Sequence, residues 1–446
     1  MKNHKQISVD SNFVINNYKD YVTERKQTLF KFKSGSEQII TAQTPSISET
    51  YGRATAIEGN YAFVGKPGPA TQAGAVEVYQ KSNGTWVFKQ LLVAADASND
   101  DDFGLSLDVS GTTLAIGAPQ TEDNSETNHG AVYIFDLQTN GTWTQTAKLT
   151  ADNKGAGDKL GNSVAIDGDV LVTGAYFEDT TASNSGAAYV FSRSGGSWSQ
   201  TTMLKAADAE ENDEFGYPHS VAIQGNTIVV GAPKEDTGFT NAGAAYIFTY
   251  DGSSWSQAQK IQAATRAAED FFSLDVNISG DYIVLGAILR NSNGLSNSGA
   301  AYVFKRGIDG TYTEKQILTP SDAAANDRFG FGIDIQGDLL MIGAYQDNTD
   351  AGSLYLFQKT ADDVWRQNDK IVASNAASND EFASSVKLSG TSLIVGSRFS
   401  DPGSVSAAGS AYFYEIEPSE EFTIRTPNLQ PPFSLLTPGI HSLRTK

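Results

Sequence analysis

The chain lacks cysteine entirely and has only 3 methionines and 4 histidines among its 446 residues. Without cysteine it can form neither disulfides nor thiolate metal sites, although this absence does not by itself assign a compartment. No apolar run reaches the ~18 residues of a membrane span, so we expect no membrane insertion. The polar amino terminus lacks the apolar core of a secretion signal, which leaves a protein of the cell interior, one exported by another route, or one carried on a particle.

Positive charge is also scarce. The chain has 32 Lys and Arg against 52 Asp and Glu, a net charge of −20, and its pI is near 4.6. Nucleic-acid binding requires clustered Lys and Arg to neutralise phosphates, and an anionic membrane surface attracts the same residues. We therefore expect neither of them as a partner.

Glycine, by contrast, is abundant, with 42 residues, and it recurs in a pattern that repeats seven times. A glycine that closes a tight turn is followed six residues later by a second glycine, then by a third after a variable loop, and five residues on by an aromatic. The second glycines are Gly65, Gly117, Gly174, Gly231, Gly286, Gly343 and Gly396. A period of roughly 55 residues indicates a repeat architecture.

Within each copy, apolar and polar residues alternate as they do in β-strands. Val164 and Ile166 alternate with polar or small residues, and the following segment, such as LAIGA or LMIGA, is apolar on both faces and therefore deeply buried. A third strand such as AAYVF follows, and a fourth carries a tryptophan in most copies. Each copy thus predicts a four-stranded antiparallel meander.

Seven such meanders bury their faces only by packing around a common axis, so we predict an all-β, seven-bladed β-propeller with aromatics between the blades. The last copy lacks a fourth strand. We expect residues 29–42 to supply that strand, because their spacing to Tyr51 matches the spacing in other copies. Phe422–Thr426 is the rival for that place. We predict an arm at 1–28, a propeller at 29–416 with repeats starting near 51, 103, 160, 215, 272, 329 and 382, and a tail at 417–446.

Two complete motifs point to a family. Phe103-Gly104 is followed by Gly117-Ala118-Pro119, and Phe215-Gly216 by Gly231-Ala232-Pro233. This resembles the FG-GAP repeat of the integrin α-subunit head and of many bacterial surface proteins, which implies a propeller and, by analogy, a binding role. The integrin-type calcium loop between the first two strands is missing, because those hairpins are too short to wrap the ion. The chain is more similar to the shorter bacterial subtype, with a Trp-x(5)-Leu strand before an acidic loop.

Antiparallel connectivity places the long loops, second-to-third and fourth-to-first, on one face, and these loops hold the acidic residues. The candidates for ligand or cation binding are Asp96, Asp100, Asp102, Asp123, Asp179, Asp208, Asp213, Asp236, Asp327 and Asp347. One interpretation is that the Asp before Phe-Gly accepts backbone N–H bonds in its turn and the rest are solvated. The others are Ca²⁺ held between blades by carboxylates, and direct contact with a basic ligand.

Catalysis finds little support in the sequence. No Gly-x-Ser-x-Gly, P-loop or His-Glu-x-x-His motif occurs, and no pair of carboxylates stands out. His4 and His441 lie in the terminal segments and His129 precedes a repeat glycine. His219 lies in an insertion unique to the fourth copy, Tyr217-Pro218-His219; we expect a solvated loop residue there, although the proline could re-aim the side chain at the channel mouth.

The sequence therefore predicts a non-enzymatic binding or adhesion module, exposed outside a cell or on a particle, that recognises a protein or glycan through its long acidic loop face. Two alternatives remain open. The first is a structural or receptor-binding subunit of a larger assembly, such as a phage virion or tail, docking through residues 1–28 and 417–446. The second is a propeller hydrolase or lyase. No cofactor is required, and Ca²⁺ is the one candidate ion.

Overall fold

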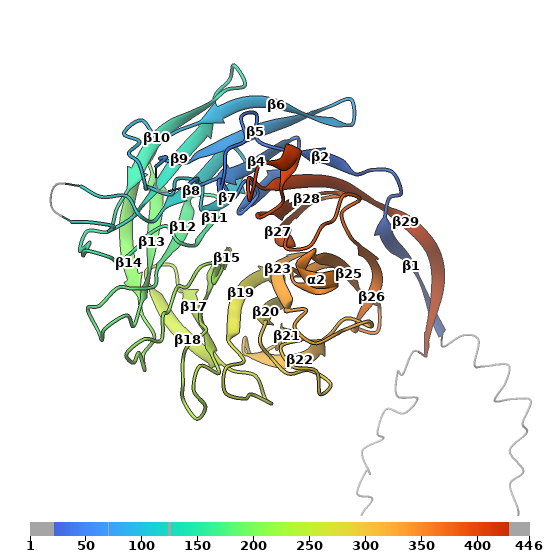
Figure 1. Ribbon diagram of the computed structural model, residues 1–446. Coiled ribbons are helices and arrows are strands. Elements are labelled where there is room, and N and C mark those ends of the chain that lie inside the picture. Colours follow the sequence, from blue (N-terminus) through green and yellow to red (C-terminus); the bar gives the residue numbers. More distant parts are fainter. Residues whose placement is uncertain (1–21, 70, 124–125, 428–446) are drawn as a thin grey trace, which may run out of the picture.

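The computed structural model describes residues 22–69, 71–123 and 126–427 (Figure 1). These residues form a ring of seven antiparallel sheets, the blades, arranged around a central axis (Figure 1). The predicted all-β, seven-bladed propeller is therefore confirmed. None of the helical turns in the described residues approaches the length or apolar character that crossing a bilayer requires.

In each blade the strands follow one another from the axis outwards. The first strands are β3 (Thr55–Glu58), β7 (Ser106–Ser110), β11 (Val164–Asp167), β15 (Val221–Gln224), β19 (Phe272–Ser279), β23 (Phe329–Gln336) and β27 (Phe382–Ser389). The second strands are β4 (Tyr61–Lys66), β8 (Thr113–Ala118), β12 (Val170–Ala175), β16 (Thr227–Ala232), β20 (Tyr282–Ala287), β24 (Leu339–Ala344) and β28 (Ser392–Ser397).

The outer strands complete each meander. The third strands are β5 (Ala75–Ser82), β9 (Ala131–Leu137), β13 (Ala187–Ser194), β17 (Ala244–Tyr250), β21 (Ala300–Arg306), β25 (Ser353–Lys359) and β29 (Ser410–Pro427). The fourth strands of blades 1 to 6 are β6 (Thr85–Leu92), β10 (Trp143–Leu149), β14 (Ser197–Leu204), β18 (Trp255–Ile261), β22 (Tyr312–Leu318) and β26 (Trp365–Ile371). A helical turn, α2 (Asp347–Asp350), lies in the loop after β24.

The amino-terminal segment supplies the missing fourth strand of blade 7. Both β1 (Val22–Phe32) and β2 (Gln38–Ile40) pair with β29, with Phe32 opposite Ile416 and Ile39 opposite Tyr412. Residues 29–42 therefore close the last blade, as the spacing to Tyr51 predicts.

The paired strands extend past the limits that the sequence suggested. Strand β1 begins at Val22 and β29 continues to Pro427, and these two residues are partners in a two-stranded ribbon that runs beyond the ring (Figure 1). The predicted boundaries at 28/29 and 416/417 are therefore wrong, and the rival segment Phe422–Thr426 is the outer part of the same ribbon. The two segments pair their backbones with each other, and β1 also bonds to side chains of blade 6 such as Gln358, which one segment's pattern does not reveal. Residues 1–21 of the arm and 428–446 of the tail lie outside the described residues.

The hydrophobic core lies between blades rather than inside them. Trp143 of blade 2 packs edge-on against Phe63 of blade 1, with ring centroids 4.9 Å apart. Phe329 is fully buried in a cluster drawn from blades 5 and 6. The predicted placement of the aromatics between blades is confirmed.

The repeated Phe-Gly and Gly-Ala-Pro segments join consecutive blades. The backbone N–H of the Phe-Gly aromatic donates to a carbonyl of the preceding blade, for example from Phe103 to Ala73 at 3.0 Å. The closing junction repeats this bond, from Tyr51 to Ala408 at 2.9 Å. The second glycine faces the next junction's backbone so closely that a side chain on Gly117 would overlap the Gly161 carbonyl oxygen. The regular spacing of these glycines along the sequence therefore places one close backbone contact at each junction between blades.

Candidate functional site

One acidic residue of every fourth-to-first loop caps its own turn. It lies two residues before the Phe-Gly aromatic, and its carboxylate accepts the backbone N–H of the residue three positions earlier, at 2.5–2.9 Å. The seven are Glu49, Asp101, Asp158, Asp213, Asp270, Asp327 and Asp380. Asp213 and Asp327, two of the ligand candidates, therefore hold the turn.

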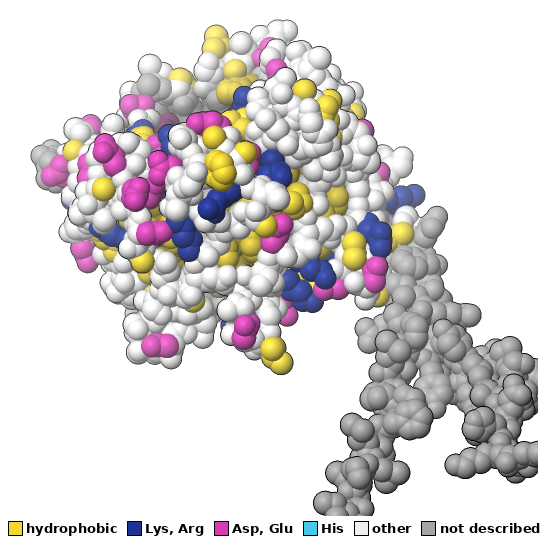
Figure 2. Space-filling model, turned by 90° about the horizontal axis from the view of Figure 1, so that it is seen from below, with side chains coloured by type: hydrophobic (Ala, Val, Ile, Leu, Met, Phe, Trp, Pro, Cys, Tyr) yellow, Lys and Arg dark blue, Asp and Glu magenta, His cyan; other side chains and the backbone are white. Residues whose placement is uncertain are grey.

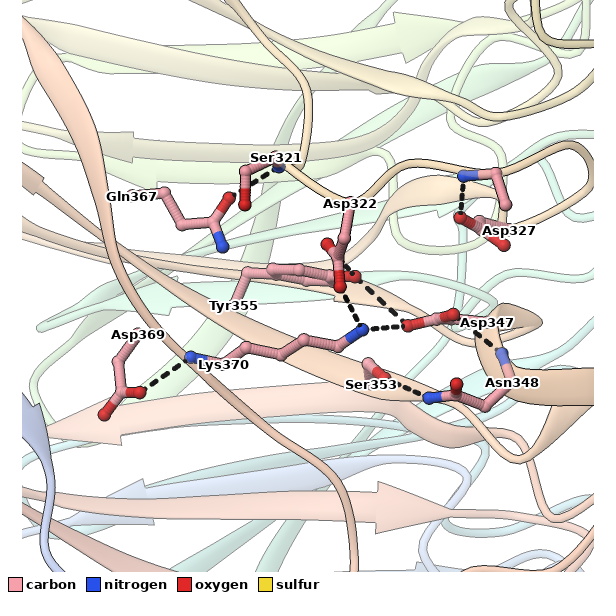
Figure 3. Close-up of polar contacts among 11 residues, drawn as sticks. Ser321, Asp322, Asp327, Asp347, Asn348, Ser353, Tyr355, Gln367, Asp369 and Lys370 are labelled. Atoms are coloured by element: carbon pink, nitrogen blue, oxygen red, sulfur yellow. Dashed lines mark hydrogen bonds and ion pairs between the residues drawn. The ribbon is translucent and has the colours of Figure 1, made fainter.

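A second group of candidates is bound by lysine. In blade 6, the Lys370 ammonium lies 2.7 Å from Asp322 and 2.6 Å from Asp347, over the ring of Tyr355 (Figure 3). The Tyr355 hydroxyl donates toward both carboxylates at 3.1 Å. Burial alone would raise the pKa of Asp347, but the hydrogen bond and charge of Lys370 outweigh it and hold that pKa below its ordinary value.

Blades 2 and 4 repeat this arrangement. Lys148 binds Asp96 at 2.6 Å above the Tyr133 ring. Lys260 binds Asp208 at 2.6 Å and Glu235 at 2.7 Å above the Tyr246 ring. The three lysines each follow the fourth-strand tryptophan by five residues, a signal that sequence reasoning could have used and did not. The carboxylates of Asp96, Asp208 and Asp347 are therefore partly neutralised.

The remaining candidates are bound less uniformly. Asp123 forms an ion pair with Lys154 and lies 3.5 Å from His129. Asp179 accepts the Asn184 backbone N–H at 2.7 Å.

Asp100 and Asp102 share the side-chain amide of Gln120, at 3.4 and 2.6 Å. Asp236 is exposed on the loop face. Viewed from the rim, acidic and basic side chains are interspersed over the outer surface of the ring (Figure 2). Because lysines bind Asp96, Asp123, Asp208 and Asp347, the loop face carries both signs of charge and is not a uniform acidic field.

Among the residues that the structure describes, no three Asp, Glu, His or Cys side chains gather closely enough to hold a metal ion. Ca²⁺ has a preference for six to eight oxygen ligands, so loop carboxylates would have to leave their present partners to bind it. Calcium binding at the acidic loops stays a prediction.

The central channel is polar and contains groups that the sequence did not single out. It encloses a cavity of about 70 Å³ whose walls include Ser106, Ser163, His219, Asp275 and Lys387. His219 is not the solvated loop residue that we expected, because its left-handed backbone, with φ of 66°, turns the ring into the channel, 5.1 Å from Phe331. Burial, with the nearby positive charges of Arg53 and Arg398, lowers its pKa to about 3.

Three channel carboxylates tie neighbouring first strands together. Asp108 accepts the Ile166 N–H at 2.8 Å, and Asp334 accepts the Leu388 N–H at 2.8 Å. Asp275 accepts the Gly332 N–H at 2.9 Å. Lys387, which is 3.8 Å from Asp334, is the cation nearest to all three. A charged residue between two apolar strand residues, as in Leu107-Asp108-Val109, is the signal that could have found all three acids and Lys387.

We expect the channel to make stability depend on pH. Burial raises the pKa of Asp275 to about 7, whereas the unfolded residue titrates near 4. Between these values the folded state keeps a proton that the unfolded state has released, so stability falls as pH rises through this window. His219 has the opposite effect, but only below the ordinary histidine pKa of about 6.5.

The melting temperature is therefore expected to fall between about pH 6.5 and 8. Asp275→Asn, which has almost the same shape and no titrating proton, should remove most of that fall and melt higher than the wild type at the alkaline end. Scanning calorimetry of both proteins across this range measures it. A fall of the same size in the variant would assign the pH dependence to other groups.

Aromatic rings and arginines gather where the channel opens on the long-loop face. Tyr176 packs on Tyr217 at 5.3 Å, and Phe331 packs on Tyr345 at 5.1 Å. The Arg398 guanidinium lies over the rings of Phe331 and Tyr345, at 6.0 and 5.7 Å. We call the set Arg53, Tyr176, Tyr217, Phe331, Tyr345 and Arg398 the channel mouth.

The channel mouth uses two repeat positions at which the seven copies differ. Arg53, Tyr217 and Phe331 directly follow the Phe-Gly pair or its equivalent. Tyr176, Tyr345 and Arg398 replace the proline of Gly-Ala-Pro. The other copies hold Leu105, Asn162, Leu274 and Ser384 at the first position and Pro67, Pro119, Pro233 and Ile288 at the second. The fold therefore does not require an aromatic or an arginine at either position.

Arg53 is the one arginine of the channel mouth whose side chain lacks a partner among the described residues. It belongs to blade 1, yet its charge acts on Glu381 of blade 7, Asp102 of blade 2 and His219 of blade 4, which places the guanidinium near the axis. Arg398 is bound to Glu381 at 2.6 Å, whereas the Arg53 guanidinium has no hydrogen bond or ion pair with any described residue. Burial and the charge of Arg398 lower the pKa of Arg53. Within the described part of this acidic protein, a cation without an ion pair thus lies near the axis.

Comparison with known proteins identifies the repeat. A family model described as the FG-GAP repeat matches residues 86–135, 143–191, 198–248, 255–304, 312–357 and 365–414. Each segment runs from the aromatic of one fourth strand to that of the next third strand, so each match spans a blade junction. No curated protein matches the chain.

Two solved structures share the fold. One is a candidate 6-phosphogluconolactonase from Bacteroides uniformis, with a TM-score of 0.51 and 12% identity, covering 72% of this chain and 85% of that one. The other is a periplasmic gluconolactonase, PpgL, from Pseudomonas aeruginosa, with a TM-score of 0.50 and 11% identity, covering 78% and 93%. At such identities the likeness concerns the fold alone.

Proposed function

We propose a function for this chain, which belongs to the FG-GAP repeat family. It is a non-enzymatic binding module exposed outside a cell or on a particle. Its long-loop face recognises a protein or glycan ligand, and the ligand presents an acidic group to the channel mouth. The observation that carries the proposal is the Arg53 guanidinium, which is unpartnered among the described residues and lies close enough to Tyr176 and Tyr217 for its charge to act on both.

The chemistry of the channel mouth supports an acidic ligand. A guanidinium presents planar donors that match a carboxylate or a sulfate, and it binds such groups more strongly when water is partly excluded. The rings of Tyr176 and Tyr217 are partly exposed and offer apolar faces on which a sugar ring or a side chain can stack, whereas Phe331 and Tyr345 are buried under the Arg398 guanidinium. The net charge of −20 repels acidic molecules elsewhere on the surface, which favours a ligand whose acidic group reaches this point.

Substitution of Arg53 tests the proposal. Glucuronate represents an acidic glycan and N-acetyl-glutamate an acidic peptide, and both are titrated by NMR or calorimetry. We expect saturable binding of one of the two, weakened by about tenfold in Arg53→Gln because a charge-assisted contact is lost. Arg306→Gln is the matched control, since Arg306 is exposed at the end of β21 on the short-loop face. Failure of both probes to bind, or equal loss in the two variants, contradicts the proposal.

The non-enzymatic part of the proposal has its own test. The two solved structures bear lactonase names, so hydrolysis of δ-gluconolactone is the natural assay. We expect the protein to leave the spontaneous rate unchanged. Acceleration that Arg53→Gln or His219→Gln abolishes would show that the channel is catalytic.

The ribbon of β1 and β29 favours a second candidate function, that of a subunit in a larger assembly. Its outer ends, Val22 and Pro427, are partners beyond the ring, and Gln27 bonds the ribbon to Lys359 of blade 6 at 2.7 Å. A chain lacking residues 1–21 and 428–446 keeps both strands whole. Light scattering on full-length and shortened protein separates the two functions, because a monomer in both cases argues against assembly.

A further inference from the structure

A groove between blades 3 and 4 lies away from the channel mouth. It has a volume of about 360 Å³ and is bounded by the short turns at Gly225 and Ser253–Ser254, which belong to the short-loop face. The described residues that line it include Val170, Ser192 and Trp255, and none of the lining residues is charged. The uncharged lining of the groove contrasts with the net charge of −20 of the whole chain.

The groove exists because one side chain is too short. In blades 1 and 5, a tyrosine opens the second strand and covers the tryptophan of the next blade: Tyr61 packs on Trp143 at 5.6 Å, and Tyr282 on Trp365 at 5.7 Å. Both tryptophans are almost completely buried, 1% and 2% exposed. Val170 holds the equivalent position in blade 3 and leaves part of the Trp255 ring open.

The open ring forms part of an aromatic platform. The ring of Tyr250 lies 5.2 Å from that of Trp255 at an interplanar angle of 37°. Trp143 and Trp365 use their faces for packing within the protein, whereas Trp255 keeps part of its face at the groove. Aromatic faces of this kind stack on apolar patches, including the C–H face of a pyranose ring.

The walls supply unused hydrogen-bonding groups. The side chains of Ser192, Thr202 and Asn226 line the groove and have no hydrogen bond with any described residue. The Tyr250 hydroxyl and the Trp255 indole N–H are likewise without a partner among those residues. These groups include both donors and acceptors, which a sugar hydroxyl can satisfy in either role.

We propose that this groove binds a neutral monosaccharide unit of a glycan. The ring of the sugar stacks on Trp255, and its hydroxyls bond to Ser192, Thr202 and Asn226. The volume falls in the range of about 300–1,000 Å³ that small-molecule sites occupy. The groove has no side chain to pair with a uronate or a sulfate among the described residues that line it, which sets it apart from the channel mouth. The proposal does not depend on the function of the channel mouth.

Three probes test the groove: methyl α-D-glucopyranoside, methyl β-D-galactopyranoside and N-acetylglucosamine. Saturation-transfer NMR measures binding to the full-length protein, and tryptophan fluorescence follows the same titration. We expect at least one probe to bind saturably, with a dissociation constant of about 1 mM, typical of a single stacked ring with a few hydrogen bonds.

Two substitutions address the groove and one serves as the control. Val170→Tyr installs the residue that covers the tryptophan in blades 1 and 5, so it should fill the groove, keep the fold and weaken sugar binding by about tenfold or more. Trp255→Ala should weaken it equally by removing the platform. Trp198→Ala is the matched control, because Trp198 holds the same repeat position in blade 3 and lies under Arg193, outside the groove.

The result that supports the proposal is loss of binding in Val170→Tyr with an unchanged melting curve, while Trp198→Ala binds as the wild type does. Absence of saturable binding of all three sugars to the wild type overturns it. Unchanged binding in Val170→Tyr overturns it as well, and this holds even where Trp255→Ala fails to fold.

Discussion

Phe329→Ala is expected to lower the free energy of unfolding by about 3–5 kcal/mol, the usual cost of a large cavity in a packed core. The Phe329 ring is fully buried between blades 5 and 6, with Tyr355 and Phe357 at centroid distances of 5.5 and 5.9 Å. Its backbone is held by the junction bond from its N–H to Ser298, at 3.0 Å, so the chain cannot move in to fill the space. Chemical denaturation followed by tryptophan fluorescence measures the change.

Phe239→Ala is the matched control for this substitution. Phe239 lies in a long loop and is 48% exposed, so its truncation removes little buried area and should change stability by less than about 0.5 kcal/mol. Equal effects of the two substitutions would mean that the Phe-Gly aromatic is not a junction residue.

Gly117→Ala is expected to cost about 3 kcal/mol, at the upper end of overpacking effects. A methyl group at this position would overlap the Gly161 carbonyl oxygen of the next blade and the Ser106 hydroxyl. The obstructing carbonyl belongs to backbone that is itself bonded, since the Gly161 N–H donates to the Gly174 carbonyl at 3.1 Å. Relief therefore requires two blades to separate, and the melting temperature should fall.

Gly111→Asn separates this effect from the general cost of replacing glycine. Gly111 has a φ of 59°, and a side chain there would meet nothing within 4 Å. Asparagine tolerates the left-handed region, so the variant should lose no more than about 1 kcal/mol. A larger loss at Gly111 than at Gly117 would contradict the account of the repeat glycines as spacers between blades.

Local sequence spacing predicted the ring correctly because each blade is a local unit. The turn glycines, the second glycines and the junction aromatics act within one repeat and its neighbour. Their spacing in the sequence therefore predicts both the number of blades and the strand that closes the ring. The turn-capping role of Asp213 and Asp327 could be inferred for the same reason, since the backbone N–H that donates to each carboxylate lies only three residues away in the chain. The outer part of the ribbon, where residues before 29 pair with residues after 416, was not predicted from the sequence, because its two strands lie at opposite ends of the chain.

The site was less accessible to sequence reasoning. The acids of the loop face were found by composition, but the lysines that bind Asp96, Asp208 and Asp347 were not. His219 was noticed for its insertion and assigned a solvated role, whereas the left-handed backbone turns it into the channel. Whether the loop carboxylates bind a ligand or Ca²⁺ stays a prediction.

The sequence by itself determined the number of blades, the junction residues and the face on which the long loops lie, because these depend on periods of two residues and of one repeat. Only the tertiary structure decided which side chains meet on the axis. Arg53, Tyr176, Tyr217, Phe331 and Arg398 come from blades 1, 3, 4, 6 and 7, and no local pattern brings them together. Closing the ring does so, since each blade directs the same two repeat positions toward one channel.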